Sequence, residues 1–271
     1  MSEKASHVGD IAIVLHSHMP YVEGFGTYPF GEEWLFDAVI RSYLPLLEVA
    51  ESLSMTITPV LADQLESDGI RARIGEFART YRLGSALDDS REMETAELRA
   101  ACEAEAERYR VGVERLEESG GDVLSSFVEA ERSGRIELVA SAATHAIFPL
   151  IATAAGRRLQ LGTGLRSHRR RFGAASGFWL PECAYEPGLE ALLAEHGIDY
   201  FCVDQSAFGE PSDALRPIRA GSTTALPLDW EAIQWLWSLD GYPSWPGYSD
   251  FHRETYRGGR PWTIGGDAYD P

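Results

Sequence analysis

Cysteine, lysine and long apolar runs are all scarce in this chain of 271 residues. Its three cysteines, Cys102, Cys183 and Cys202, are widely spaced and odd in number, which excludes a disulfide framework and a CxxC metal knuckle. Apolar runs such as residues 11–15 are far shorter than the ~18 residues that span a bilayer. The polar start MSEKASHVGD lacks the apolar core of a signal peptide, so we expect a cytoplasmic protein with reduced thiols.

Positive charge is also scarce, because Lys4 is the only lysine and the formal net charge is −18. A chain with this charge repels polyanions, which argues against nucleic acid and anionic membranes as partners. It is compatible with a neutral substrate such as a sugar. The main basic cluster, on an expected helix, is interpreted as a solvated face; it comprises Arg157, Arg158, Arg166, Arg169, Arg170 and Arg171.

Motifs of several common enzyme classes are missing too. No serine lies in a GxSxG elbow, which argues against a serine hydrolase. No GxGxxG or P-loop string follows an expected strand, so a loop that binds phosphate or a dinucleotide is not predicted. The hydrophobic content of 44% is nevertheless sufficient to bury a full core.

Short strand-like runs alternate with helical patterns, which is typical of βα units that feed a parallel sheet. The expected strands are residues 11–15, 55–60, 136–140, 178–181, 200–204 and 224–228. Two helical stripes lie between them, at Leu44, Leu47, Ala50 and Leu53 and at Leu189, Leu192, Leu193 and His196. A longer stretch, about 61–134, carries Cys102, Ala106, Tyr109, Val113 and Leu116 at helical spacing and predicts a helical insertion.

The chain is short for a closed βα barrel with such an insertion, since a barrel typically needs ~250 residues without one. We therefore predict an α/β fold in which residues 1–271 form one barrel domain that is incomplete at its C-terminal end. From Trp230 onward the sequence predicts long loops, because it is rich in Trp, Tyr, Pro and Gly without a clear period. Aromatic faces can stack on sugar rings, and the candidate tryptophans of this half are Trp179, Trp235, Trp237, Trp245 and Trp262.

One carboxylate stands out by its position. The run 177–180, GFWL, suits a buried strand, and Pro181 marks the end of sheet pairing because it lacks a backbone donor. Glu182 is then the first side chain beyond the strand. Ligands of parallel α/β folds bind outside the carboxyl ends of the strands, so Glu182 is either a catalytic carboxylate or a solvated loop residue. We interpret its neighbour Cys183 as a packing residue.

Three histidines also follow expected strands. His16 and His18 form an HxH pair after the first strand, and in extended backbone only one of them would face a given site. HxH is a metal-ligand spacing as well, but the nearest upstream acid, Asp10, lies at the wrong end of the strand, so hydrogen bonding to substrate hydroxyls is the better interpretation. His145 follows the third strand and is expected on the same rim as His16 and Glu182.

Longer segments resemble glycoside hydrolase family 57, and within it the 1,4-alpha-glucan branching enzymes. The family's first region is similar to VLHSHMPYV with YPFGEEWLFDAV and SYLPLL, its second to IELVASAATHAIFPLI, and its third to GFWLPECAYEPGLEALLAEHGIDYFCVD. A segment of the branching members resembles WSLDGYPSWPGYSDFHRETYR, which carries an inserted SWPGY. The likeness runs from about Ala12 to the last residue.

The resemblance implies a distorted, TIM-like (β/α)7 barrel and a retaining mechanism on α-1,4-glucan, without a cofactor or a metal. It implies that Glu182 is the nucleophile. Substrate contacts are implied for His16, His18, His145, Trp179 and Tyr28.

The resemblance also implies a general acid that this sequence does not supply. In the family the acid is an aspartate on a later strand, followed by a helical C-terminal domain. Asp229, Asp240 and Asp267 do not match the context of that aspartate. Loss of a general acid typically lowers a rate ~10²- to 10⁴-fold, so we expect a truncated enzyme that is weak or inactive alone.

Three other functions remain open at this stage. The first is an α-amylase or 4-α-glucanotransferase of the same family. The second is a non-catalytic glycan-binding remnant, which would keep the aromatic and histidine surface without turnover. The third is a metal-dependent, deacetylase-like hydrolase on a related barrel.

Overall fold

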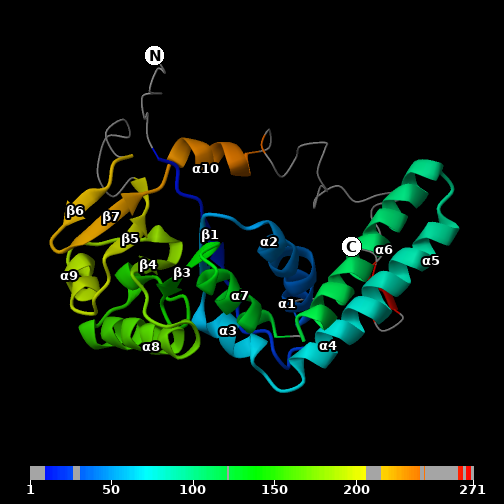
Figure 1. Cartoon of the computed structure of the whole chain (residues 1–271), viewed down its shortest axis with the longest axis horizontal. Helices are drawn as coiled ribbons and strands as arrows, with labels where there is room; N and C mark the ends of the chain where they lie inside the picture. Colours follow the sequence, from blue (N-terminus) through cyan, green and yellow to red (C-terminus); the bar gives the residue numbers. More distant parts are fainter. Residues whose placement is uncertain are drawn as a thin grey trace, which may run out of the picture.

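The computed structural model of the chain describes residues 10–26, 31–120, 122–205, 215–238 and 241, together with the backbone of 262–264 and 267–269. A mostly parallel β-sheet lies on one side of the molecule with helices packed along it, and a long helical hairpin extends from the other side (Figure 1). This arrangement confirms the predicted α/β class. None of the described helices is long and apolar enough to cross a membrane.

The main sheet has seven strands in the order β1-β2-β3-β4-β5-β7-β6. Six of them run parallel: β1 (Val14–Ser17), β2 (Leu53–Ile57), β3 (Ile136–Ser141), β4 (Gly177–Trp179), β5 (Tyr200–Val203) and β7 (Thr223–Pro227). At one edge β6 (Ile218–Ala220) pairs antiparallel with β7, and β1 forms the other edge. No pairing among the described strands joins β1 to β6, so the sheet is open, as predicted for an incomplete barrel.

Helical segments fill the connections between these strands. In chain order they are α1 (Glu33–Ala38), η1 (Val39–Tyr43), α2 (Leu44–Val49), α3 (Pro59–Leu65), α4 (Ile70–Phe77), η2 (Ala78–Leu83), α5 (Gly84–Glu92), α6 (Ala96–Glu118), α7 (Val123–Arg132), η3 (Phe148–Leu150), α8 (Ala154–Phe172), η4 (Pro181–Cys183), α9 (Leu189–Ala194) and α10 (Trp230–Trp237). Near the end of the chain, β8 (Trp262–Ile264) and β9 (Asp267–Tyr269) form a separate antiparallel pair.

The predicted strand boundaries are wrong at several ends. Ile11 is 93% exposed and lies outside β1, which begins only at Val14. Pro59 begins α3 instead of continuing β2, because a proline suits the first turn of a helix but cannot donate to a sheet. Leu53 opens β2, so the helical stripe before it ends with α2 at Val49.

The predicted helical insertion is confirmed, and its middle part forms the projecting hairpin. Helices α5 and α6 lie side by side at the right of Figure 1. Ala106, Tyr109, Val113 and Leu116 of α6 are buried at the predicted helical spacing. At the hairpin's base Arg82 pairs with Asp37 at 2.6 Å, and the Tyr109 hydroxyl donates to the same carboxylate at 2.7 Å.

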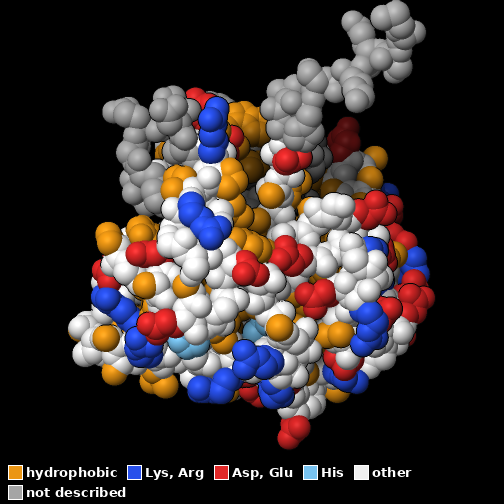
Figure 2. All heavy atoms as spheres, turned by 60° about the vertical axis from the view of Figure 1, so that its left-hand side comes forward, with side chains coloured by type: hydrophobic (Ala, Val, Ile, Leu, Met, Phe, Trp, Pro, Cys, Tyr) orange, Lys and Arg blue, Asp and Glu red, His pale blue; other side chains and the backbone are white. Residues whose placement is uncertain are grey.

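One prediction about surface segments is wrong, and another, the solvated basic face, fails at one residue. Residues 230–237 form helix α10 instead of a loop, and the Asp229 side chain caps it by accepting a hydrogen bond from the Ala232 amide at 3.0 Å. In the basic cluster, the Arg171 side chain is only 4% exposed and pairs with Asp63 and Glu66. Basic and acidic side chains are interspersed on the face shown in Figure 2. Trp245 lies outside the described residues, and only the backbone of Trp262 is described.

Close approach of α8 to the sheet depends on a glycine. A Cβ atom added to Gly164 would lie 2.1 Å from the carbonyl oxygen of Ser141, the last residue of β3. Beside this contact, Leu161, Phe178 and Phe201 are fully buried in one apolar core. Gly164 therefore allows the helix to cover the end of the strand that leads to His145.

We predict that Gly164→Ala will lower the free energy of unfolding by roughly 2 kcal/mol or more, because the helix must move off the strand. Gly162→Ala is the matched control. Only Arg166 lies near its added Cβ, at 3.7 Å, so better helix propensity is expected to raise the free energy of unfolding by about 0.5–1 kcal/mol. Urea denaturation of both variants tests this, and equal effects would contradict the close contact.

A second prediction concerns His168 of α8, which is buried with neither ring nitrogen hydrogen bonded among the described residues. Burial lowers the pKa of His168 from 6.5 to about 4. The unfolded chain therefore binds this proton more readily, and acid favours unfolding between pH 6.5 and 4. Relative to the His168→Leu variant, the wild type should lose up to about 1.4 kcal/mol of unfolding free energy for each unit by which the pH falls in that window. Denaturant titrations at several pH values measure the difference, and parallel pH profiles would contradict it.

Candidate active site

The loop after β4 presents one carboxylate at the carboxyl end of the sheet. Leu180, Pro181 and Cys183 are buried, whereas the Glu182 side chain is 64% exposed. Two hydrogen bonds fix the loop: the Cys183 amide donates to the Leu180 carbonyl at 2.8 Å, and the Asp204 amide donates to the Cys183 carbonyl at 3.0 Å. Buried neighbours on both sides thus hold Glu182 outward from the end of the strand.

The backbone at this point is strained. Glu182 and Cys183 have φ values of 57° and 52°, and His145 has a φ of 57°. Residues other than glycine rarely adopt this left-handed backbone conformation, because it costs on the order of 1–3 kcal/mol per residue. Such strain persists only where the surrounding structure imposes it. Here it occurs on two neighbouring loops of the same rim.

The three predicted histidines converge beside Glu182. The Nε2 atoms of His16 and His145 are 2.8 Å apart, and the rings of His18 and His145 stack with centroids 4.0 Å apart. His145 Nε2 lies 3.7 Å from Glu182 Oε1. The predicted rim of imidazoles around Glu182 is therefore present as a contiguous cluster.

In extended backbone only one residue of the HxH pair would face the site, whereas the structure brings both to His145. β1 ends at Ser17, so His18 lies outside the strand and is not bound to the alternation of side chains that applies within it. His16, within β1, and His18, beyond it, both contact His145 through their rings.

Burial makes the imidazoles weak bases. It lowers the pKa of His16 to about 3 and that of His18 to about 4, and nearby His145 adds to both shifts. Burial also lowers the pKa of His145, although the Glu182 carboxylate acts in the opposite direction. All three rings are therefore neutral at pH 7, each with one N–H donor and one acceptor nitrogen.

Trp179, the last residue of β4, completes the cluster. Its ring stacks on His16 with centroids 4.9 Å apart and an interplanar angle of 13°. Its Nε1–H is buried without a hydrogen-bond partner among the described residues. Tyr28, the remaining predicted subsite residue, lies outside the described residues.

Sequence reasoning missed the polar residues that hold these histidines in place. Thr56 Oγ1 lies 2.5 Å from His16 Nδ1, and Thr58 Oγ1 lies 3.1 Å from His18 Nδ1. The Gln64 side chain binds the loop after β1, accepting from the Val22 amide at 2.7 Å, and Gln160 of α8 accepts from the Thr144 amide at 3.1 Å. The available signal was a pair of threonines two residues apart, one within β2 and one directly after it.

The other acidic residues considered from the sequence have different places. Asp229 caps α10, Asp240 lies outside the described residues, and only the backbone of Asp267 is described. Asp204 follows β5 on the same rim as Glu182. Within the described part of the chain, no group of three or more His, Cys, Asp and Glu residues is arranged to hold a metal ion. Cys183 is buried, which raises the pKa of its thiol and agrees with a packing role.

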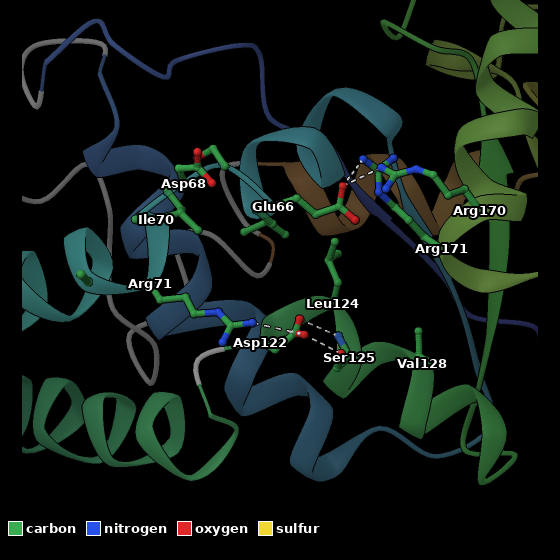
Figure 3. Close-up of a pocket in the computed structure, with 14 residues that line it drawn as sticks. Glu66, Asp68, Ile70, Arg71, Asp122, Leu124, Ser125, Val128, Arg170 and Arg171 are labelled. Carbon is green, nitrogen blue, oxygen red and sulfur yellow. Dashed lines mark hydrogen bonds and ion pairs between the residues drawn. The ribbon is translucent and has the colours of Figure 1, made fainter.

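A cavity of about 580 Å³ lies apart from Glu182 and the histidines, where the ends of α3 and α8 meet α4 and α7. Several of its charged side chains form ion pairs (Figure 3). Glu66 pairs with Arg170 and Arg171, and Arg71 pairs with Asp122. Apart from Asp68, whose carboxylate forms no ion pair among the described residues, the charged side chains drawn there are already paired with one another.

The strain at Glu182 gives a testable expectation for the free energy of unfolding. Glu182→Gly should raise it by about 1 kcal/mol, because glycine adopts a φ of 57° without a steric cost. Glu182→Gln keeps the strained backbone and should change it little. Thermal or urea denaturation of the two variants makes the comparison, and a stabilisation shared by both would assign the effect to charge instead of backbone.

Comparison with known proteins gives a consistent result. The chain is 30% identical to the 1,4-alpha-glucan branching enzyme of Thermococcus kodakarensis over 94% of this chain and 44% of that protein. It resembles the crystal structure of the GH57-type branching enzyme of Pyrococcus horikoshii, with a TM-score of 0.85 and 31% identity over 94% of this chain and 53% of that one. For the α-amylase AmyC of Thermotoga maritima the TM-score is 0.82, with 29% identity over 91% and 51% of the two chains.

The chain thus spans about half the length of the relatives it matches. The matched half includes the whole described sheet and the rim with Glu182. Residues 12–228 also match the profile of Glycosyl hydrolase family 57. Together with the predicted motifs and the open parallel sheet, these matches show that the chain belongs to glycosyl hydrolase family 57.

Proposed function

We propose that this chain forms the nucleophile-bearing part of a retaining enzyme that acts on α-1,4-glucan, with Glu182 as the nucleophile. The observation that carries the proposal is the placement of Glu182, an exposed carboxylate held by a strained and buried loop at the carboxyl end of β4. Its nearest charged or titratable contact is neutral His145, at 3.7 Å.

A retaining glycosidase needs a carboxylate that is ionised and free to attack the anomeric carbon. No arginine contacts Glu182 among the described residues, so its oxygens are not held in an ion pair. Attack forms a bond from a carboxylate oxygen to the anomeric carbon as the bond to the leaving oxygen breaks. A second nucleophile then releases the sugar: water gives hydrolysis, and a sugar hydroxyl gives transfer.

The neutral aromatic cluster supplies binding groups suited to an uncharged sugar. Neutral imidazoles offer both donors and acceptors to hydroxyl groups, and they do not compete for the negative charge of Glu182. The stacked faces of Trp179 and His16 form an apolar surface next to these polar edges. We assign His18 and His145 to the binding of the donor sugar through their remaining ring nitrogens, and His16 and Trp179 to its binding through their rings.

Protonation of the leaving oxygen needs a second carboxyl group about 5–5.5 Å from the nucleophile. We propose that an aspartate in a further part of the protein supplies this group, since the matched relatives are about twice as long as this chain. The 271 residues alone would then cleave ordinary glucan slowly. A cytoplasmic location remains a prediction, and a role in glycogen synthesis would follow from the proposed activity on α-1,4-glucan.

Branching is the favoured activity, because curated relatives of the chain are 1,4-alpha-glucan branching enzymes or are named as probable ones. Hydrolysis by an α-amylase is the second candidate, because the TM-score to the α-amylase of Thermotoga maritima is 0.82. Incubation of the full-length protein with amylose separates the two. New α-1,6 linkages are expected for branching, whereas reducing ends without such linkages would favour hydrolysis.

The nucleophile is tested with a mechanism-based glycosyl fluoride. Fluoride leaves without protonation, so covalent labelling does not need the missing acid. We expect labelled peptide to contain Glu182 in the wild type and labelling to disappear in Glu182→Gln. Mass spectrometry of a proteolytic digest measures both.

Glu186→Gln is the matched control, since Glu186 lies four residues along the same segment and pairs with Arg157 at 2.5 Å. Its labelling should match that of the wild type. Labelling that persists in Glu182→Gln, or that maps to another carboxylate, would falsify the assignment of the nucleophile.

A further inference from the structure

We infer that Thr56 is a positioning residue, whose hydroxyl fixes the proton positions on His16 and His145 so that His145 presents an unprotonated Nε2 toward Glu182. The inference rests on the proposed function of Glu182 as nucleophile and adds a residue to its machinery. Thr56 contacts neither Glu182 nor the space where a sugar would bind, because it is fully buried in β2. It acts through His16.

The first step is the hydrogen-bond balance of the Thr56 hydroxyl. Its oxygen accepts from the Ser17 amide at 3.2 Å and lies 2.5 Å from His16 Nδ1. If His16 Nδ1 carried the proton, the hydroxyl hydrogen would be a buried donor without an acceptor among the described residues. Such a donor is costly. The hydroxyl therefore donates to His16 Nδ1.

The second step follows from the neutrality of His16. A neutral imidazole has one N–H, so an unprotonated Nδ1 places the proton of His16 on Nε2. That Nε2 lies 2.8 Å from His145 Nε2, and one hydrogen must lie between the two nitrogens. His16 donates it, and His145 accepts on Nε2 and carries its own proton on Nδ1.

The third step concerns Glu182, whose Oε1 lies 3.7 Å from His145 Nε2. A proton on that nitrogen would be drawn to the carboxylate and would reduce its power as a nucleophile. With the lone pair of His145 Nε2 engaged by His16, no proton is available there. Acting through the two imidazoles, the buried Thr56 hydroxyl thus keeps the Glu182 carboxylate free of a hydrogen bond from His145.

Tautomer assignment by NMR tests this without reference to catalysis. In protein labelled with ¹⁵N-histidine, two- and three-bond ¹⁵N–¹H correlations distinguish Nδ1–H from Nε2–H in each ring, and single His→Gln variants assign the signals. We expect the wild type to show His16 protonated at Nε2 and His145 protonated at Nδ1. A wild-type spectrum with His16 protonated at Nδ1 overturns the inference, and this measurement needs no Thr56 variant to fold.

Variants then isolate the hydroxyl. Thr56→Val has nearly the same shape without the hydroxyl, and Thr56→Ser retains it. We expect the His16 and His145 tautomers to change in the valine variant and to be kept in the serine variant. Thr58→Val, which removes the hydroxyl next to His18, is the matched control and should leave the tautomer of His16 as in the wild type. Unchanged tautomers in Thr56→Val overturn the inference.

The kinetic measurement is the rate at which the glycosyl fluoride labels Glu182. Thr56→Val should lower this rate about tenfold or more, and Thr56→Ser should restore it to within roughly twofold of the wild type. If the wild type is not labelled at Glu182, the proposed function fails while the spectra still decide the role of Thr56. If labelling proceeds at the wild-type rate in Thr56→Val, the proposed effect of Thr56 on Glu182 through His16 and His145 is overturned.

Discussion

The candidate site depends on one constraint, the parallel register of β1 to β5. Parallel pairing brings the carboxyl ends of these strands to one rim, and the register sets His16 beside Thr56 and Ser141 beside Trp179. A slip of one residue in β2 would turn Thr56 to the opposite face and separate its hydroxyl from His16. The loops after β3 and β4 then need only a few residues to bring His145 next to Glu182.

The sequence predicted this rim because Glu182 and the histidines each follow an apolar run, and such a run is a strong signal of a strand. It did not predict Thr56, since a β-branched threonine within a strand is also an ordinary strand former, and burial of its hydroxyl depends on the neighbouring strand. Helix α10 was missed because it has only eight residues and lies in a segment rich in Trp, Tyr, Pro and Gly, which indicates loops. Arg171 was misread because its acidic partners, in α3 and directly after it, are far away in the sequence.

The charged surroundings of Glu182 differ from those of several other carboxylates in the chain. The chain carries a net charge of −18, and carboxylates such as Asp37, Glu66 and Glu186 are held by arginines. Glu182 instead lies beside rings that burial keeps neutral. Desolvation therefore does two things here: it removes positive charge that would pair with the carboxylate, and it fixes the histidines as neutral hydrogen-bonding groups.

The loop that carries Glu182 has a consequence for how this fold changes during evolution. Leu180, Pro181 and Cys183 are committed to the interior, so the one position free to vary without disturbing the core is the position that bears the carboxylate. If Glu182 is the nucleophile, as proposed, a single substitution there would remove the proposed chemistry and leave the fold and the histidine cluster in place. On that proposal, a non-catalytic form of this fold is one substitution away, and the demands of core packing do not by themselves keep an acid at residue 182.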